Sequence, residues 1–286
     1  MSEPIVSMPK SFQLDKDVKA LYIDLLKKCL TRSLFDHPYK PLQPRGPIKR
    51  LSNFIIRKIL APYRLELVRK VPLALRRFDG SQWPAWAETM VSLKGLDNIQ
   101  HCVIDLIRRN VPGDLIETGV WRGGAAIFMR GILKAYDGTK RVVWVADSFE
   151  GLPKPDPTRY PYDSGDDIWT FSELKVPLEE VKRNFERYGL LDDQVRFLVG
   201  WFGDTLSHAP IERLALLRLD GDMYESTIQV LQHLYAKVSL GGYIIIDDYG
   251  MLEACRAAVE DFRSQNDITE ALNWVDRSVV YWQRQQ

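Results

Sequence analysis

The 286-residue sequence predicts an α/β fold in which helices cover both faces of a parallel sheet. The main observation is that five short apolar runs alternate with segments of helical spacing after Gly113. Strands that are apolar on both faces and separated by helices are typical of such a sheet. A second observation is that the last two apolar runs lie only two residues apart. This spacing suits an antiparallel hairpin rather than a crossover connection.

The N-terminal part of the chain is predicted to be helical. Apolar residues recur at helical spacing in three segments, 18–26, 51–60 and 96–107. Between the first two, residues 36–47 contain four prolines and a glycine, which predicts a loop. Pro62 ends the second helix, and Pro112 with Gly113 ends the third. We therefore divide the chain into a helical region, residues 1–112, and a sheet domain, residues 113–286.

In the sheet domain, strands and helices follow one another in a regular order. Strands are expected at 115–118, 142–147, 195–199, 214–220 and 242–247, and the hairpin at 273–276 and 279–283. Helices are expected at about 124–136, 177–188, 223–238 and 251–265. Five parallel strands followed by an antiparallel hairpin are the Rossmann-like class I layout of methyltransferases that use S-adenosylmethionine. Because many doubly wound proteins look similar, residues at the strand ends have to support this interpretation.

The composition is that of an ordinary globular protein, with 45% hydrophobic and 27% charged residues. The net charge of +1 hides a split, because residues 1–112 contain 20 Lys/Arg and 10 Asp/Glu, whereas residues 113–286 contain 19 and 28. The positive charge is concentrated in a basic segment, residues 40–77, with eleven Lys/Arg and one acid, Glu66. A total near zero and the lack of an RNA-binding signature argue against a nucleic-acid partner.

The cysteines and the apolar runs indicate the compartment. Cys29, Cys102 and Cys255 lie far apart and form no disulfide pattern, which fits a reducing environment. No apolar run reaches the roughly 18 residues of a membrane span, and the N-terminus lacks the apolar stretch of a signal peptide. We therefore expect a cytoplasmic protein.

The first predicted strand leads into a glycine-containing turn, residues 117–124 (ETGVWRGG). Glycines allow close approach to a ligand, and the N-terminus of the next helix favours an anionic group. The E-x-G-x-x-x-G spacing differs from that of dinucleotide-binding proteins. It favours S-adenosylmethionine, whose carboxylate could sit on the helix amides. A plain strand-to-helix turn is the alternative. The cofactor contacts expected in this turn are Glu117, Thr118, Gly119 and Trp121.

The second strand ends in Asp147, followed by Ser148. An acid at this strand end can accept hydrogen bonds from both hydroxyls of an adenosine ribose. The alternative is that Asp147 caps a helix, or starts a turn with Ser148. Because Glu117 and Asp147 stand on neighbouring strand ends, an adenosine cofactor is favoured, with Asp147 and Ser148 among its contacts.

Carboxylates from the fourth and fifth strand ends should meet at one edge: Asp220, Asp247 and Asp248. Clustered carboxylates repel one another, so one must be protonated unless a cation neutralises them. Oxygen ligands suit a hard ion such as Mg²⁺, with Ca²⁺ or Mn²⁺ as substitutes. The alternative is that one aspartate caps the next helix and another pairs with an arginine. For Asp222, the capping-box spacing to Glu225 favours a helix-capping role.

A long polar loop, residues 150–171, follows the second strand and is rich in proline. Loops of that length are commonly lids over a site. Its aromatic residues could close over a substrate or pack the loop against the domain: Tyr160, Tyr162, Trp169 and Phe171.

Six segments, in the same order, resemble the macrocin O-methyltransferase family of antibiotic pathways. They are WPAWAETM (83–90), LDNIQ (96–100), DLIETGVWRGGA (114–125), ADSFEGLP (146–153), LRLDGDMYEST (217–227) and GGYIIIDDYG (241–250). Six ordered segments are far more specific than one glycine motif. The resemblance runs from about residue 83 to the end, with a weaker match at 22–31. The segment 40–77 lies outside it.

The resemblance implies a magnesium-dependent O-methyltransferase that uses S-adenosylmethionine to methylate a sugar hydroxyl, typically on a deoxysugar of a natural product. It assigns Asp220, Asp247 and Asp248 to the metal and Asp222 to the general base. It also implies a homo-oligomer, at least a dimer. The family positions for the cofactor correspond to Thr89 and Met90, ahead of the sheet, and to Glu117, Gly119, Asp147 and Trp201.

This chemistry agrees with the residues. Methyl transfer is a direct displacement on a sulfonium, so the protein mainly has to align the acceptor oxygen with the methyl group. A sugar hydroxyl is a poor nucleophile at neutral pH. A metal bound to it would lower its pKa, and Asp222 could accept the proton.

Two other functions stay open. A metal-dependent O-methyltransferase of a catechol or another small diol would use the same carboxylates. The other alternative is a protein that binds a membrane or another partner through the segment 40–77, since basic amphipathic helices can bind anionic lipid. Most such helices in soluble enzymes are solvated faces. The sequence therefore favours a small, sugar-containing substrate over a membrane partner.

Overall fold

The central element of the protein is a seven-stranded sheet with the strand order β5-β4-β3-β6-β7-β9-β8. A computed structural model describes residues 14–34, 39–42, 47–70, 84, 86–136 and 140–286. Strands β3 to β7 are parallel, and β9 runs antiparallel between β7 and β8. The predicted sheet with its C-terminal hairpin is therefore confirmed. The strands are β3 (Asp114–Thr118), β4 (Val143–Asp147), β5 (Val195–Val199), β6 (Leu214–Leu219), β7 (Val238–Ile246), β8 (Asn273–Trp274) and β9 (Val280–Gln283).

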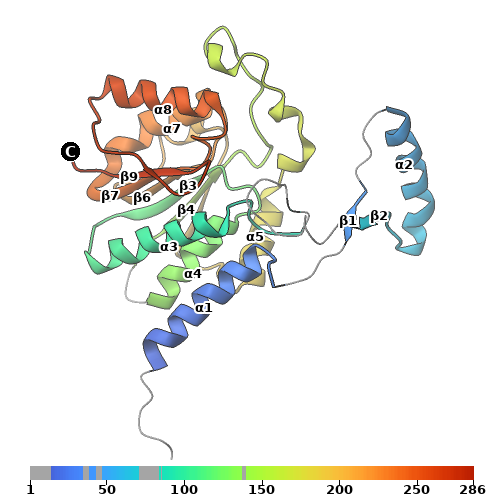
Figure 1. The fold of residues 1–286 in the computed structure, drawn as a ribbon, viewed down its shortest axis with the longest axis horizontal. Coiled ribbons are helices and arrows are strands. Elements are labelled where there is room, and N and C mark those ends of the chain that lie inside the picture. The colour runs from blue at the N-terminus through green and yellow to red at the C-terminus, as the bar shows by residue number, and fades with distance from the viewer. Residues whose placement is uncertain (1–13, 35–38, 43–46, 71–83, 85, 137–139) are drawn as a thin grey trace, which may run out of the picture.

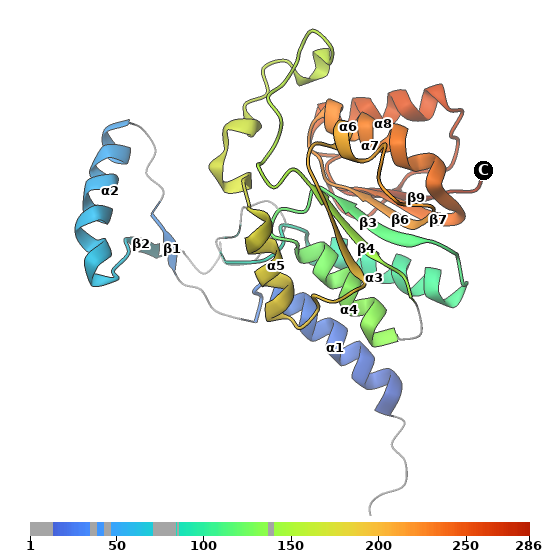
Figure 2. The same ribbon diagram turned by 180° about the vertical axis from the view of Figure 1, so that it is seen from behind.

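Helices cover both faces of this sheet, as Figures 1 and 2 show. Neighbouring strand residues point to opposite faces, so Leu115 belongs to one apolar core and Ile116 to the other. The first core includes side chains of α1 (Leu14–Leu30), α3 (Leu93–Arg108), α4 (Gly124–Tyr136) and α5 (Leu178–Arg187). The second includes side chains of α7 (Tyr224–Leu234) and α8 (Glu253–Gln265), next to the short α6 (Phe202–Thr205).

In the sheet domain, two boundaries differ from the prediction by four residues, and the other differences are of one or two residues. Strand β7 begins at Val238, four residues before the predicted start, because Val238 pairs with Leu214 before a register shift around Gly241 and Gly242. Glycines weaken a strand pattern, so the sequence hid this pairing. Helix α7 ends at Leu234, and the next three residues form a 3-10 turn rather than continuing the predicted helix to residue 238.

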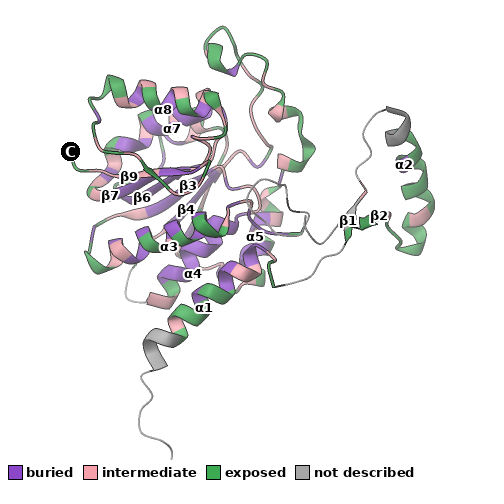
Figure 3. Ribbon diagram, in the orientation of Figure 1, coloured by how far each residue is buried: buried purple, intermediate pink, exposed green. Residues whose placement is uncertain are grey.

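Part of the basic N-terminal segment lies apart from the sheet domain in both views of the ribbon (Figures 1 and 2). It contains the helix α2 (Pro47–Leu60) and a two-stranded ribbon of β1 (Tyr39–Pro41) and β2 (Val68–Lys70). The predicted helix is confirmed, whereas β1 lies where the sequence predicted a loop. Figure 3 shows that the outer part of α2 is mostly exposed, in contrast to the buried strands of the main sheet.

The strand order reverses between β3 and β6. From β3 the chain moves outward through β4 to β5, and then returns to β6 on the other side of β3. In open parallel sheets, ligands bind beyond the carboxyl ends of the strands at such a switch point. Within the described residues, no helix is both long and apolar enough to span a bilayer.

Candidate active site

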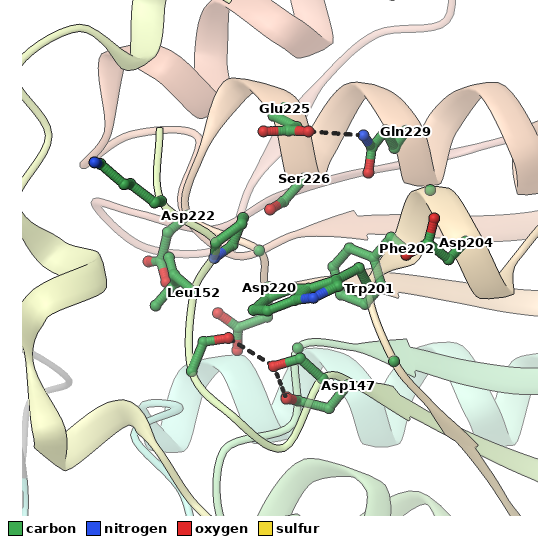
Figure 4. A pocket seen from close by; sticks show the side chains of 18 of the residues that line it. Asp147, Leu152, Trp201, Phe202, Asp204, Asp220, Asp222, Glu225, Ser226 and Gln229 are labelled. Carbon is green, nitrogen blue, oxygen red and sulfur yellow. Dashed lines mark hydrogen bonds between the residues drawn. The ribbon is translucent and has the colours of Figure 1, made fainter. Parts of the chain in front are cut away.

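A cavity of about 760 Å³ lies at the carboxyl edge of the sheet. Its lining comes from the turn after β3, the end of β4 with its following loop, the β5–α6 connection, and the β6–α7 connection. This size is in the range of small-molecule sites. In Figure 4, Asp147, Asp220 and Trp201 surround the same space, with the first turns of α7 forming another wall.

The three predicted metal ligands do converge. Asp220 follows β6, and Asp247 and Asp248 follow β7, its neighbour in the sheet. One carboxylate oxygen from each lies within 4.8 Å of the others. The parallel pairing explains this, because the Asp247 amide donates to the carbonyl of Leu219, at the end of β6. The geometry is that of a small all-oxygen cluster, which is the ligand set that hard cations prefer.

A buried arginine that the sequence analysis did not predict pairs with this cluster. Arg218 lies on β6, is fully buried, and donates to Glu117 at 2.6 Å, to Asp220 at 2.8 Å and to Asp247. The expected alternative, in which an aspartate pairs with an arginine, is thus present together with the convergence. Its sequence signal was a single arginine in an otherwise apolar strand, LALLRL (214–219).

The carboxylates keep unusual pKa values in spite of Arg218. Burial raises the pKa of Asp247 to about 7, although Arg218 lowers it, and burial raises the pKa of Asp248 well above its ordinary value. Burial also raises the pKa of Glu117 to about 8. One buried oxygen of Asp248, Oδ2, has no hydrogen-bond partner within the described residues. A buried carboxyl oxygen without a partner, beside two other carboxyl groups, fits a bound cation, which would favour the charged form of all three groups.

Asp222, the predicted general base, lines the cavity. Its backbone has a φ of 59°, in the left-handed region that non-glycine residues rarely adopt. Burial, followed by the charge of Asp220, raises its pKa to about 8. The capping role favoured by the sequence is wrong, because helix α7 starts one residue later than the capping box requires and Asp163 caps it from another loop.

The glycine turn after β3 holds the two sides of the site together. Gly119 lines the cavity with a φ of 82°, and a Cβ atom there would lie 1.7 Å from the carbonyl oxygen of Asp220. The amide of Gly124, at the start of α4, donates to the carbonyl of Glu88 at 2.9 Å. That amide therefore already has a protein partner, so the expected seat for a ligand carboxylate on the helix N-terminus is at least partly filled.

The other cofactor positions fall into two groups. Met90, Trp121, Ser148 and Trp201 line the cavity. Glu117, Thr118 and Thr89 are buried behind it: the hydroxyl of Thr118 donates to the carbonyl of Arg218, and that of Thr89 accepts from the amide of Val91.

Asp147 lines the cavity at the end of β4, where the sequence predicted a ribose-binding acid. Its Oδ2 accepts from the Val120 amide at 2.8 Å, and its Oδ1 accepts from the Phe149 amide at 2.7 Å. These amides fix the carboxylate and leave lone pairs on both oxygens. Burial raises the pKa of Asp147, while the amides of Val120 and Phe149 lower it. The turn predicted as the alternative is therefore present without excluding a ligand.

The long loop after β4 uses its aromatic residues in two ways. Tyr160 lines the cavity, whereas Tyr162 stacks on Tyr224 of α7 with the ring centroids 5.4 Å apart. Trp169 lies under the ammonium group of Lys154, and the loop also places Arg159 at the cavity. Packing of the loop against the domain is therefore observed, whereas the closing of these aromatic residues over a substrate stays a prediction.

Comparison with known proteins identifies the family. A sequence profile described as macrocin-O-methyltransferase (TylF) matches residues 19–284. The chain belongs to this family. It is therefore an O-methyltransferase, as the resemblance predicted. The match includes the basic segment 40–77, so the expectation that this segment lies outside the family was wrong. The resemblance rested on six motifs, and the segment 40–77 contains none of them, so its membership of the family was not recognised from the sequence.

The relatives agree with this assignment. Demethyldecarbamoylnovobiocin O-methyltransferase of Streptomyces niveus is 48% identical over 285 residues, which cover 98% of each chain. The 8-demethyl-8-(2,3-dimethoxy-alpha-L-rhamnosyl)-tetracenomycin-C 4'-O-methyltransferase of Streptomyces olivaceus is 47% identical over 270 residues, 94% of each chain. The solved structure of the O-methyltransferase NovP is 46% identical, with a TM-score of 0.79, and covers 94% of this chain and all of its own. The predicted methyltransferase fold is confirmed.

Proposed function

We propose that this protein is an S-adenosylmethionine- and Mg²⁺-dependent O-methyltransferase that acts on a hydroxyl of a sugar, typically a deoxysugar, in a natural product. One observation carries the proposal: Asp147 faces the same cavity as Asp220, whose carboxylate clusters with those of Asp247 and Asp248. An adenosine-binding acid and a hard-cation cluster then lie at one site. The rhamnosyl group named in the Streptomyces olivaceus relative supports a sugar acceptor.

On the cofactor side, S-adenosylmethionine supplies the methyl group. Asp147 accepts hydrogen bonds from its ribose, and the ring of Trp201, which is 37% exposed, offers a stacking surface for its adenine. The remaining residues predicted to contact the cofactor form two groups, one lining the cavity and one buried behind it. Gly119, Met90, Trp121 and Ser148 face the cofactor, whereas Glu117, Thr118 and Thr89 hold the turn in place from behind.

On the acceptor side, Asp220, Asp247 and Asp248 would hold Mg²⁺, which lowers the pKa of a hydroxyl that it binds. Asp222, which lines the same cavity as Asp220, would accept the proton of the acceptor hydroxyl. A base works best when its pKa is near the working pH, and the pKa of Asp222 is about 8. Tyr160 and Arg159, from the loop after β4, would contact the sugar and exclude water from the reacting oxygen.

The test is calorimetric titration of Mg²⁺ and of S-adenosylmethionine, with Asp248→Asn as the variant and Asp193→Asn, an exposed carboxylate, as its control. Asp248→Asn should weaken Mg²⁺ binding by about tenfold or more, since even groups that only support a metal ligand matter by about 10–100-fold. Wild type and control should bind both molecules. Failure of wild type to bind S-adenosylmethionine would contradict the function, and methyl transfer that survives EDTA would contradict the metal's role.

Acceptor panels separate sugars from diols. Purified enzyme is incubated with desmethyl deoxysugar glycosides in one panel and with catechols in the other, and mass spectrometry detects the methylated product. We expect product from the glycosides. Methylation confined to the catechols would replace the sugar by a small diol without changing the assignment of the carboxylates.

We further propose that the protein is a homo-oligomer, at least a dimer, and that the N-terminal region contributes to its contacts. Helix α2 exposes a run of apolar side chains that are 40–62% accessible: Leu51, Phe54, Ile55, Ile56 and Ile59. Contiguous exposed apolar surface of this kind marks an interaction site. A second copy is the favoured occupant, because basic residues of α2, Arg57 and Lys58, would be attracted by the excess of acidic residues in another sheet domain.

A further inference from the structure

We infer that Asp163, in the loop after β4, is a positioning residue for methyl transfer: it caps helix α7 and so leaves the carboxylate of Asp222 free to face the acceptor. The inference rests on the proposed function, because Asp222 is the base in that proposal. It adds a residue that is not among those lining the cavity and that acts through the start of one helix.

The cap comes from a distant part of the chain. Helix α7 begins at Tyr224, and the first amides of a helix have no partner within the helix itself. Its N-cap residue, Met223, makes no capping hydrogen bond with its side chain. Instead, Asp163 Oδ1 accepts from the Tyr224 amide at 2.7 Å and Oδ2 accepts from the Glu225 amide at 3.0 Å. Asp163 is completely buried, and both of its oxygens are used in this contact.

Asp222 is the natural competitor for the same two amides. A helix that started one residue earlier would have Asp222 as its N-cap, and an N-cap side chain binds the amides two and three residues further on. Those amides are the ones of Tyr224 and Glu225. In the structure, neither carboxylate oxygen of Asp222 has a hydrogen-bond partner among the described residues. Because Asp163 occupies the amides, Asp222 stays at the cavity.

The same contact fixes the loop that faces the acceptor. Next to Asp163, Tyr162 stacks on Tyr224 with an angle of 12° between the ring planes, and Tyr160 reaches the cavity. The capping bond and the stack both hold the loop against the first turn of α7. A single anchor therefore fixes both the start of α7, next to the proposed base, and the loop that brings Tyr160 to the cavity.

A double-mutant cycle distinguishes positioning of Asp222 from a general effect on folding. The variants are Asp163→Ala, Asp222→Asn and the pair, with kcat and KM measured for methyl transfer and S-adenosylmethionine affinity measured by calorimetry. We expect Asp163→Ala to lower kcat by about 10–100-fold, as misplacement of a catalytic group does, with the cofactor affinity changed by less than about twofold. In the Asp222→Asn background, Asp163→Ala should have almost no further effect on kcat.

Two further variants complete the experiment. Asp163→Asn should have a kcat between those of Asp163→Ala and wild type. Its amide oxygen can still accept from one of the two backbone amides, whereas its amide nitrogen cannot accept a hydrogen bond. Asp167→Ala is the matched control, since Asp167 is an exposed carboxylate four residues along the same loop whose side chain makes no cap. Its kcat should stay within about twofold of wild type.

The inference is overturned if Asp163→Ala leaves kcat unchanged, or if it slows the Asp222→Asn enzyme by the same factor as wild type. A crystal structure of Asp163→Ala gives a readout that needs no turnover. We expect Asp222 to turn back and accept from the amides of Tyr224 or Glu225, and an unmoved Asp222 contradicts the inference. If wild type transfers no methyl group to any acceptor, the proposed function fails. The crystal structure of Asp163→Ala would still decide whether Asp163 keeps Asp222 away from the cap.

Discussion

The carboxyl edge of the main sheet and the helix α2 differ in what they bury. The sheet edge buries charged groups, whereas α2 exposes apolar side chains. At the sheet edge, Arg218 is fully buried, and carboxylates surround its guanidinium group. On α2, basic residues such as Arg57 lie on a helix whose apolar side chains, such as Ile55 and Ile59, are half exposed or more. Buried charge of the first kind depends on its partners within the chain. Exposed apolar surface of the second kind is the type of surface through which a chain can bind a partner.

The difference predicts where substitutions affect folding and where they affect assembly. The largest effect on folding is expected for Arg218→Met, because it removes the guanidinium group that pairs with Glu117, Asp220 and Asp247. Breaking a buried ion pair by removing one partner costs about 3–5 kcal/mol. Urea denaturation at neutral pH, without added metal, should show a loss of that size in the free energy of unfolding.

Arg213→Met is the matched control for Arg218, because Arg213 is exposed and directly precedes the same strand. Its free energy of unfolding should stay within about 0.5 kcal/mol of wild type. A loss below about 1 kcal/mol for Arg218→Met would show that the carboxylates compensate by protonation, and would break the contrast between the two regions.

An intermediate effect is expected for Asp192, which joins two parts of the sheet domain away from the cavity. Arg130 donates to both of its oxygens, at 2.8 and 2.6 Å, and these bonds lower the pKa of Asp192 below its ordinary 3.8. A carboxyl group whose pKa is lowered by folding stabilises the fold above its unfolded pKa. This contribution is lost as the pH falls through the folded pKa.

Asp192→Asn should therefore cost about 1–2 kcal/mol at pH 7. The difference between wild type and variant should stay constant down to about pH 5, and shrink below pH 4. Urea denaturation across this pH range measures it. A difference that is equally large at the lowest pH would mean that the charge of Asp192 is not its source.

The smallest effect on folding is expected on α2. Ile55→Asp places a charge on a side chain that is already 50% exposed, so the free energy of unfolding of one chain should change by less than about 0.5 kcal/mol. The assembly should respond instead, with light scattering showing a shift from oligomer to monomer. Arg64→Asp, outside the apolar run, is the control for charge alone. An oligomer that survives Ile55→Asp would remove α2 from the interface.

The sequence predicted the positions of the site acids because strand ends are a local property. Asp147, Asp220 and Asp247 each follow an apolar run, and parallel pairing brings such ends to one edge without further information. The boundaries of β5 and α4 were also predicted correctly, because a short apolar run or a glycine marks each start clearly.

The missed residues act over long distances along the chain. Asp163 caps a helix 61 residues away, and nothing near Asp163 in the sequence indicates that contact. Arg218 was missed for another reason. Its role as a partner of the carboxylates can be predicted only when the acids of two neighbouring strands are known to surround it. Asp222 shows the limit of a local motif, because its capping-box spacing was correct and the helix still began one residue later.

The close approach of Gly119 to Asp220 has a consequence for how two substrates enter. A Cβ atom at position 119 would overlap the carbonyl oxygen of Asp220, so the turn after β3 and the end of β6 meet without a gap. In the proposed function, these two segments belong to the cofactor side and the acceptor side, and the close contact leaves no space between them for a ligand to enter. We therefore expect ligands to enter and leave the cavity past the segments above the edge, such as the loop that carries Tyr160. The rate of product release would then be a property of that loop.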